Sequence, residues 1–501
     1  MCLRRNERHL LHNMSFFRNK YQRIRVVPIL LGSCALLALL AIAVLWYLSK
    51  TVLSSQLLHT DFVKNAVVKQ IGEENSDIYD IMPIFLGFSE PQTYLIEFLN
   101  NTEIRPGGGF IGSYAVLTVD RGEITIVTLD GTENLDRNAP LALMPDALTP
   151  LKTHLGVAHW FFRDSNWSPD FAKSAEQGLS LYRLEGGISA DDIDGVIGVT
   201  PTVLEHLLAL VGPVTVQGKT FTAENVTETL EYEVEYAYED RGIHVQDRKD
   251  ILQPLFLEVM KRLKQNIITQ YKTYLSTFET LADEKHILLY HTNPTVEETL
   301  KNRHWAGSVE ATDGDYLLWV DANLGSLKTD YALDRTLSYE ILGMQDGRYI
   351  ARATMTYTHP AGFDWRTTRY ITYARVFVPL GSVFQSVRGT LRSGDAITSS
   401  QVDRGQELGK EWFGTSFSIE PKQTKSLQFT YLLPEGISKQ KAYQLLVQKQ
   451  LGTAGGTLTL DLDFATLLQS ALPPEGEAEW NNNTYRYTTD LSVDREFTVH
   501  F

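Results

Sequence analysis

The sequence predicts a mixed α+β, α/β protein with a single N-terminal transmembrane helix, an extracellular α/β domain and a β-sandwich-like C-terminal domain. Three observations lead to this prediction. A long uncharged apolar segment lies close to the N-terminus. Between residues 88 and 325, short β-rich segments alternate with segments of helical periodicity, as in α/β layer structures. Beyond residue 326, strand-like segments follow one another without helices, which is typical of a sandwich.

The apolar segment runs from Val26 to Leu48 and contains no charged residue. At helical rise its length is roughly 30 Å, the thickness of a bilayer core. A buried core helix and a cleavable signal peptide are the alternatives, but the apolar part of a signal peptide is shorter, at about 7–15 residues. Trp46 and Tyr47 near its end suit a membrane interface. We therefore expect an uncleaved transmembrane helix at residues 26–48, with the lipid bilayer as a partner.

The distribution of charge predicts the orientation. Residues 1–25 contain seven Lys and Arg residues and one Glu, and this basic tail belongs in the cytoplasm by the positive-inside rule, whether Met1 or Met14 starts the chain. The protein is therefore expected to cross the cell membrane once, with its bulk outside the cell. Because the tail carries +6 of the net charge of −15, the rest carries −21. Such an acidic domain argues against a nucleic-acid partner.

The part beyond the membrane segment contains no cysteine, since the two cysteines are Cys2 and Cys34. Its domains must therefore fold without disulfides or cysteine metal sites. Changes in the pattern of helical and strand-like segments along the chain predict four regions after the membrane segment. They are a stalk or helix at 49–87, the α/β domain at 88–325, a β-sandwich domain at 326–436, and a C-terminal β-rich extension at 437–501.

A glycine-rich stretch comes just before a predicted strand. Gly107, Gly109 and Gly112 spell G-x-G-x-x-G, the fingerprint of dinucleotide sites. That fingerprint requires a helix after the glycines, whereas this sequence continues into the strand-like segment 113–119. Two interpretations remain. The glycines form a bend or bulge between strands, or the bend exposes N–H groups that hold an anion together with the Arg105 guanidinium.

Two further stretches combine charges in unusual places. Arg163, Asp164 and Asp170 lie among aromatic residues, and form either an ion pair sealed by ring packing or the rim of a catalytic or metal site. Carboxylates bind hard cations such as Mg²⁺ through oxygen, which makes the second interpretation chemically reasonable. Further along, Asp247 is predicted to cap a long helix. Arg248 in the first turn of that helix would oppose the helix dipole.

Five segments carry a resemblance to a known family. They are "NNTEIRPGGGFIGSYAVLTVDRGEI", "FRDSNWSPDFAKSAEQ", "DIDGVIGVTPTVLEHLLALVGPV", "HWAG" and "VDANLGSLKTDYALDR", in this order along the chain. Together they resemble the bacterial membrane family known as domain of unknown function 4012, over about residues 88 to 435. That family name implies no activity.

The order of segments is also similar, more distantly, to the LytR–CpsA–Psr envelope phosphotransferases. This resemblance implies a LytR–CpsA–Psr-like α/β domain that binds polyprenyl pyrophosphate in an apolar tunnel. It also implies Mg²⁺-dependent transfer of a glycopolymer from that lipid to peptidoglycan. On the matching segments, the resemblance implies phosphate binding by Arg105, Arg163, Arg241 and Arg248.

The resemblance further implies that Arg163 and Asp164 are catalytic and that Asp164 and Asp170 hold the metal. In the LytR–CpsA–Psr pattern Arg-Ser-Asp-Thr, the aspartate helps to hold that metal, whereas this chain has Arg105-Pro-Gly-Gly-Gly and no aspartate there. Two functions are therefore expected. One is a membrane-anchored envelope phosphotransferase or lipid-pyrophosphate-binding protein, and the alternative is a non-catalytic surface scaffold or adhesion protein with a degenerate α/β domain.

Overall fold

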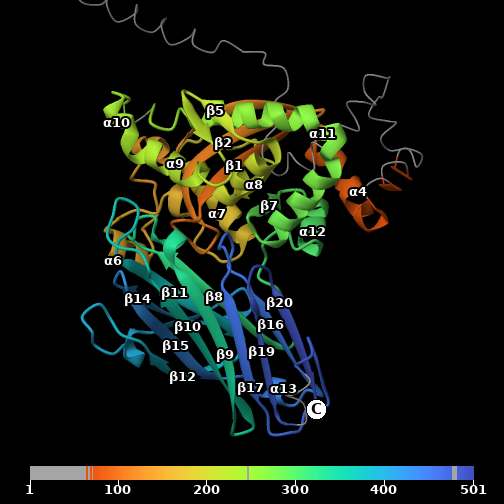
Figure 1. The fold of residues 1–501 in the computed structure, drawn as a ribbon, viewed down its shortest axis with the longest axis vertical. Coiled ribbons are helices and arrows are strands. Elements are labelled where there is room, and N and C mark those ends of the chain that lie inside the picture. Colours follow the sequence, from red (N-terminus) through yellow and green to blue (C-terminus); the bar gives the residue numbers. More distant parts are fainter. Residues whose placement is uncertain (1–63, 66–67, 70–71, 245–246, 477–481) are drawn as a thin grey trace, which may run out of the picture.

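The computed structural model describes residues 64–65, 68–69, 72–244, 247–476 and 482–501. The predicted basic tail, the predicted transmembrane helix and about half of the predicted stalk lie outside these residues. Among the described residues, no helix is both long enough and apolar enough to cross a membrane. They form an α/β domain and, below it in Figure 1, a β-rich domain of two large sheets.

The α/β domain is built on a five-stranded mixed sheet with the order β3-β2-β1-β4-β7. Strand β1 is parallel to β4, and the other neighbouring pairs are antiparallel. In β1, Tyr94 and Ile96 contact one apolar core while Leu95 and Leu99 contact another, so both faces of the sheet must be covered. The strands are β1 (Gln92–Asn100), β2 (Phe110–Asp120), β3 (Glu123–Gly131), β4 (Gly195–Val199) and β7 (Ile287–His291).

Helices cover the two faces of this sheet (Figure 1). One face packs against α4 (Ser76–Phe85), α8 (Pro201–Val211), α9 (Val226–Tyr232), α11 (Leu252–Asp283) and α12 (Pro294–Asn302). The other face packs against α5 (Thr132–Arg137) and α7 (Phe171–Leu184). The short α6 (Thr149–Leu155) instead packs against the β-rich domain. The predicted mixed α/β architecture is confirmed for this part of the chain.

The glycine-rich stretch leads into strand β2, so the predicted strand after the glycines is confirmed, where a dinucleotide fingerprint would require a helix. Gly108 and Gly109 have φ values of +116° and +145°, which favour glycine. A Cβ on Gly109 would lie 2.6 Å from the Asn100 carbonyl carbon. Phe98 pairs with Ser113 and the next residue with Ile111, so Gly112 is the extra residue of a β-bulge.

The long helix begins later than predicted. The expected N-cap Asp247 lies in a turn, and α11 starts at Leu252. Pro254 explains the difference, because it has no N–H to donate to the preceding turn. In a helix starting at Asp247 it would remove an internal hydrogen bond, whereas near the start of α11 that N–H would be unpaired in any case.

The β-rich domain consists of one six-stranded and one seven-stranded sheet that share a buried apolar core. The first has the order β12 (Val383–Arg388), β15 (Thr424–Leu432), β10 (Arg348–Thr358), β9 (Asp334–Gln345), β17 (Thr457–Asp463) and β19 (Thr484–Asp490). The second has the order β13 (Asp403–Glu407), β14 (Lys410–Ile419), β11 (Tyr370–Pro379), β8 (Asp315–Asn323), β16 (Ala442–Gln448), β20 (Arg495–His500) and β18 (Ser470–Leu472).

The extent of this second domain differs from the predicted boundaries. Strand β8 falls within the predicted α/β domain, yet it is central to the seven-stranded sheet between β11 and β16. The predicted extension at 437–501 supplies β16 to β20, which complete the same two sheets. The reason is that β16 and β17 pair in parallel with β8 and β9, and such distant pairings leave no local pattern in the sequence.

Candidate functional site

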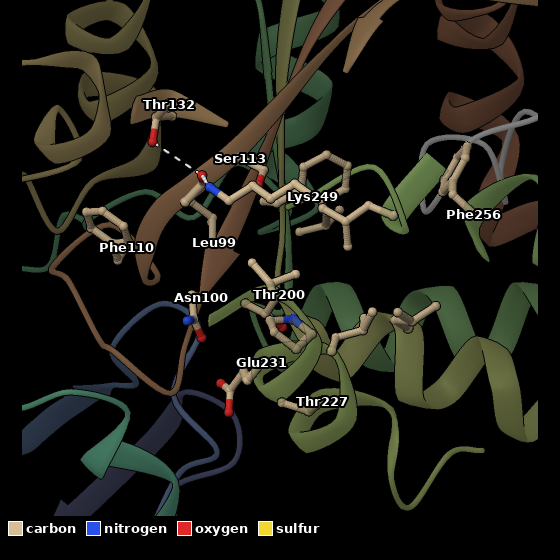
Figure 2. Close-up of a pocket in the computed structure, with 18 of the residues that line it drawn as sticks. Leu99, Asn100, Phe110, Ser113, Thr132, Thr200, Thr227, Glu231, Lys249 and Phe256 are labelled. Atoms are coloured by element: carbon tan, nitrogen blue, oxygen red, sulfur yellow. Dashed lines mark hydrogen bonds between the residues drawn. The ribbon is translucent and has the colours of Figure 1, made fainter. Parts of the chain in front are cut away.

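A cavity of about 310 Å³ lies between the sheet of the α/β domain and helices α8, α9 and α11. Figure 2 shows it with Phe256 at one end and Phe110 at the other, and with Glu231 and Thr227 of α9 on one side. Its inner part is apolar and is lined by Ile96, Phe98, Leu129, Val199, Val203, Leu204, Leu207, Leu230, Val234, Leu252, Leu255 and Phe256. Such a cavity can hold an apolar chain.

Helix α8 supplies much of this apolar wall because of how its sequence begins. Pro201 occupies the first turn, where its fixed φ suits a helix and its missing N–H costs nothing. From there Val203, Leu204 and Leu207 fall on adjacent positions of one face. The segment that follows the buried strand β4 therefore places its branched side chains over the sheet.

The other end of the cavity is polar and carries charges of both signs. Four cations line it, namely Arg163, Arg248, Lys249 and Lys328, together with the acids Glu133, Glu231 and Glu235. The cations come from distant parts of the chain, and Lys328 follows the first strand of the β-rich domain. A cationic rim over an apolar cavity matches an amphiphile with an anionic end.

Glu133 joins two of these cations. The Lys249 ammonium donates to Glu133 Oε2 at 2.6 Å and to the Gly112 carbonyl oxygen. The Arg248 guanidinium donates to Glu133 Oε1 at 3.1 Å and 3.2 Å and to Glu235 Oε2 at 2.8 Å. Burial lowers the pKa of Lys249. Burial alone would raise the pKa of Glu133, but the charge of Lys249 and its hydrogen bond outweigh it, so that pKa is lowered.

Lys328 and Glu231 lie where the two domains meet. The Lys328 ammonium lies 3.0 Å from Glu103 Oε2. Glu231 accepts hydrogen bonds from Thr102 and, at 2.6 Å, from Arg366 Nε of the β-rich domain. Burial raises the pKa of Glu231 in spite of Arg366. Both domains therefore build the polar end of the cavity.

Arg163 reaches the cavity from its other side and is backed by two buried carboxyl groups. Its Nε lies 2.7 Å from Asp136 Oδ2. Asp136 interacts in turn with Glu185, whose Oε1 accepts the Phe162 N–H at 2.6 Å. Burial raises the pKa of Glu185 to about 8 and also raises the pKa of Asp136. Because the Arg163 cation faces two acids, we expect Asp136 and Glu185 together to hold one proton at neutral pH.

Arg105 does not line the cavity. Its side chain is 2% exposed and donates to Asp164 Oδ1 at 3.2 Å, to the Asn323 carbonyl and, at 3.4 Å, to Glu103 Oε1. Asn323 belongs to β8, so Arg105 ties the glycine bend to the β-rich domain. The structure places this arginine at the domain junction, where the local sequence had left a bend and an anion site as alternatives.

The two aspartates expected to hold metal are engaged with protein groups. Asp164 accepts from Arg105, while Asp170 caps α7 by accepting the Lys173 N–H at 3.1 Å and also accepts the Val309 N–H at 3.0 Å. Among the described residues, no three His, Cys, Asp or Glu side chains gather as a metal site would require. Both aspartates thus already have protein donors as partners.

Arg241 lies outside the cavity lining and pairs with the buried Glu233 at 2.6 Å. Of the predicted phosphate-binding arginines, the structure thus brings Arg163 and Arg248 to one cavity and leaves Arg105 and Arg241 elsewhere. Sequence reasoning missed Lys249, Lys328 and the acids between them. For Lys249, its position next to Arg248 was a sequence signal that could have indicated a site residue.

Comparison with known proteins supports the family resemblance for part of the chain. Residues 89–235 match the family described as protein of unknown function, DUF4012. The matched part holds Glu133, Arg163 and Glu231 of the cavity, and ends before Arg248. The resemblance to LytR–CpsA–Psr proteins stays a prediction. No curated protein matches the chain.

Two solved structures show distant likeness. A Legionella pneumophila protein described as nutrient binding is 6% identical over 37% of this chain and 71% of its own, with a TM-score of 0.24. An M1 zinc metallopeptidase of Deinococcus radiodurans is 14% identical over 34% of this chain, with a TM-score of 0.18, and the match spans 42% of the peptidase. At these TM-scores neither likeness supports a conclusion about activity.

Proposed function

We propose that the protein is a membrane-anchored, extracellular cell-envelope protein whose cavity binds the polyprenyl-pyrophosphate end of a lipid-linked glycopolymer. The observation that carries the proposal is the apolar cavity whose polar end presents Arg163, Arg248, Lys249 and Lys328. An isoprenoid pyrophosphate has the matching chemistry, an apolar chain attached to a compact multivalent anion. The cavity volume is also within the range of ligand pockets, roughly 300–1,000 Å³.

The cations are suited to a pyrophosphate in two ways. The Arg248 guanidinium offers planar, paired donors of the kind that grip phosphate oxygens, while Lys249 supplies a compact charge. Both already share Glu133, so a bound phosphate would replace one carboxylate as the partner of two cations. A partly desolvated setting strengthens these interactions relative to water.

Transfer of the polymer to peptidoglycan is proposed from the sequence resemblance, which implies Mg²⁺ at Asp164 and Asp170. Both carboxylates are engaged with protein donors, so their geometry lends no support to a step through a metal. The support from geometry is for binding of the lipid pyrophosphate.

Binding of undecaprenyl pyrophosphate to the full-length protein in detergent micelles tests the proposal. Replacing Arg248 and Lys249 by alanine should weaken binding by about tenfold or more, because hydrogen bonds to charged groups are lost. Lys261→Ala is the matched control, since Lys261 lies on the same stretch of chain but is 58% exposed and pairs with Glu258. No binding by the unaltered protein, or equal effects of both changes, would refute the proposal.

A second function is favoured by a different observation. Each cation at the polar end already has a carboxylate partner: Asp136 for Arg163, Glu133 for Arg248 and Lys249, and Glu103 for Lys328. A non-catalytic surface scaffold would have this arrangement, with the ion pairs serving only to hold the domains. It predicts that the alanine changes lower stability while no pyrophosphate is bound at any concentration below the millimolar range.

A further inference from the structure

Three aromatic rings from both domains meet beside the cavity. Tyr232 ends α9, and Tyr236 lies in the π-helical turn that follows, Glu233–Ala237. Their ring centroids are 6.0 Å apart in a stacked arrangement, and the Trp365 ring of the β-rich domain meets each of them edge-on at 5.4 Å. The Tyr236 hydroxyl donates to the Trp365 carbonyl oxygen at 3.0 Å. We call Tyr232, Tyr236 and Trp365 the aromatic platform.

Two rings of the platform are exposed to solvent, and the third, Trp365, is half-buried. Tyr232 and Tyr236 are 45% and 43% exposed, and Phe363, two residues before Trp365, is 66% exposed. Contiguous exposed apolar surface on a folded domain commonly marks an interaction site. A π-helical turn is also an uncommon element that occurs often at functional sites. The two observations are independent, since one concerns the side chains and the other the backbone.

The platform continues directly from the polar end of the cavity. Glu231, which lines the cavity, precedes Tyr232 in α9 and binds Arg366, the residue after Trp365, at 2.6 Å. The Lys328 N–H in turn donates to the Arg366 carbonyl oxygen at 2.9 Å. The three rings lie outside the residues that line the cavity, so a ligand held by its phosphate at the polar end would reach them by passing Glu231.

The chemistry of the platform and its surroundings fits a pyranose ring. One face of a pyranose consists of C–H groups that pack on an aromatic ring, while its edge carries hydroxyls that need polar partners. Glu235, 38% exposed and on the cavity rim, and the exposed Asp364 beside Trp365 carry carboxylates near these rings. Glu235 Oε2 accepts from Arg248, and Asp364 Oδ1 accepts from two backbone N–H groups, so a hydroxyl would donate to the second oxygen of each. The same acids and the net charge of −15 disfavour a nucleic acid, the other common ligand of aromatic rings.

We propose that the aromatic platform is a saccharide-binding subsite, formed jointly by the two domains, that holds sugar residues attached to the pyrophosphate in the cavity. The inference rests on the proposed function for its lipid component, and it assigns the β-rich domain a part in ligand recognition. Saccharide stacking requires only the platform, so it is separable from phosphate binding by Arg248 and Lys249.

Two lipids that differ by one sugar test the subsite: undecaprenyl pyrophosphate and undecaprenyl-pyrophosphoryl N-acetylglucosamine, with the full-length protein in detergent micelles. The sugar-bearing lipid should bind about tenfold more tightly, in line with the contribution of one or two aromatic contacts. Replacing Tyr232 and Tyr236 by alanine should abolish this preference and leave the affinity for undecaprenyl pyrophosphate unchanged. Tyr232→Ala alone is the milder variant if the double variant unfolds.

The control is Leu467→Ala, which removes a side chain 66% exposed on the β-rich domain away from the platform. Equal affinity of the unaltered protein for both lipids, or a preference that survives in Tyr232→Ala, would overturn the inference. If neither lipid binds, the proposed function fails, and binding of soluble chitotetraose decides the subsite separately. Its binding by the unaltered protein and loss in the platform variants would support the subsite, and its absence would overturn it.

Discussion

Lys249 and Glu133 form an ion pair 2.6 Å long inside the cavity, between a residue just before helix α11 and one in the first turn of α5. The pair connects the two sides of the polar end. Glu133 also binds Arg248, whose second carboxylate partner is Glu235, so this one acid contacts two cations. An anionic ligand would compete with Glu133 for these cations. An effect of Glu133 on ligand affinity therefore distinguishes a binding site from a purely structural cluster of ion pairs.

Glu133→Gln should therefore strengthen binding of undecaprenyl pyrophosphate by about tenfold, since it removes a competing negative charge and its repulsion of the ligand. It should also lower the free energy of unfolding by about 1–3 kcal/mol, because the Lys249 ammonium loses its charged partner. Calorimetric titration and denaturant unfolding measure the two effects. Glu123→Gln, an exposed acid on β3, is the control, and an unchanged or weaker affinity in Glu133→Gln would contradict a ligand site.

Leu204→Trp should fill part of the apolar cavity. Leu204 lies on α8 among the lining residues, so a larger ring would compete with an isoprenoid chain for the same space. The variant is expected to bind undecaprenyl pyrophosphate at least tenfold more weakly and to bind inorganic pyrophosphate as the unaltered protein does. Equal binding of the long-chain lipid by the variant would show that the chain lies elsewhere.

Glu97 should make the stability of the α/β domain depend on pH. It is fully buried in β1, and neither carboxylate oxygen has a hydrogen-bond partner among the described residues. Burial raises its pKa from 4.5 to about 8. The folded state thus binds a proton that the unfolded state releases, so the contribution of Glu97 to the free energy of unfolding is greatest below pH 4.5 and falls as pH rises to about 8.

Glu97→Gln removes this ionisation, so its free energy of unfolding should fall less steeply between pH 5 and 8 than that of the unaltered protein. Urea unfolding at several pH values measures the slope. Glu185 titrates in the same range and is expected to keep part of the slope in the variant. An identical slope in both proteins would mean that Glu97 is ionised in the folded state.

Arg105→Ala should act on stability and not on ligand affinity. It would leave Asp164 without its cation at a buried junction, at a cost of about 3–5 kcal/mol. Because Arg105 does not line the cavity, the affinity for undecaprenyl pyrophosphate should change less than twofold. Thermal unfolding and titration measure the two quantities, with the 81% exposed Arg121→Ala as control. A large loss of affinity at unchanged stability would restore the phosphate-binding role implied by the family resemblance.

The sequence predicted elements well where their signals are local. Strand β2 follows the glycines as predicted because its residues alternate and branch, and helix α7 begins directly after Asp170, whose side chain caps it. The start of α11 was missed because Pro254 outweighed the capping signal at Asp247. Strand β8 was placed in the wrong domain because its partners lie more than 40 residues away in the sequence.

The site was predictable only in part, for a related reason. Arg163 and Arg248 stood out beside acids or aromatic residues, and both reach the cavity. Lys328 did not stand out, because its position depends on how the second domain docks on the first. Arg105 was prominent in the sequence but is held at that docking surface. Arg105, which does not line the cavity, and Arg163, which does, cannot be told apart from their local sequence. Only their tertiary contacts distinguish them.

The parallel pairing of β16 with β8 and of β17 with β9 has a consequence for how the chain is made. Until β16 and β17 leave the ribosome, β8 and β9 each have one unpaired edge in the middle of what will become two continuous sheets. The domain therefore cannot close as it emerges, and its high contact order makes closure slow. A chain cut short after β15 would expose both edges and aggregate, so even a late premature stop should remove the whole protein.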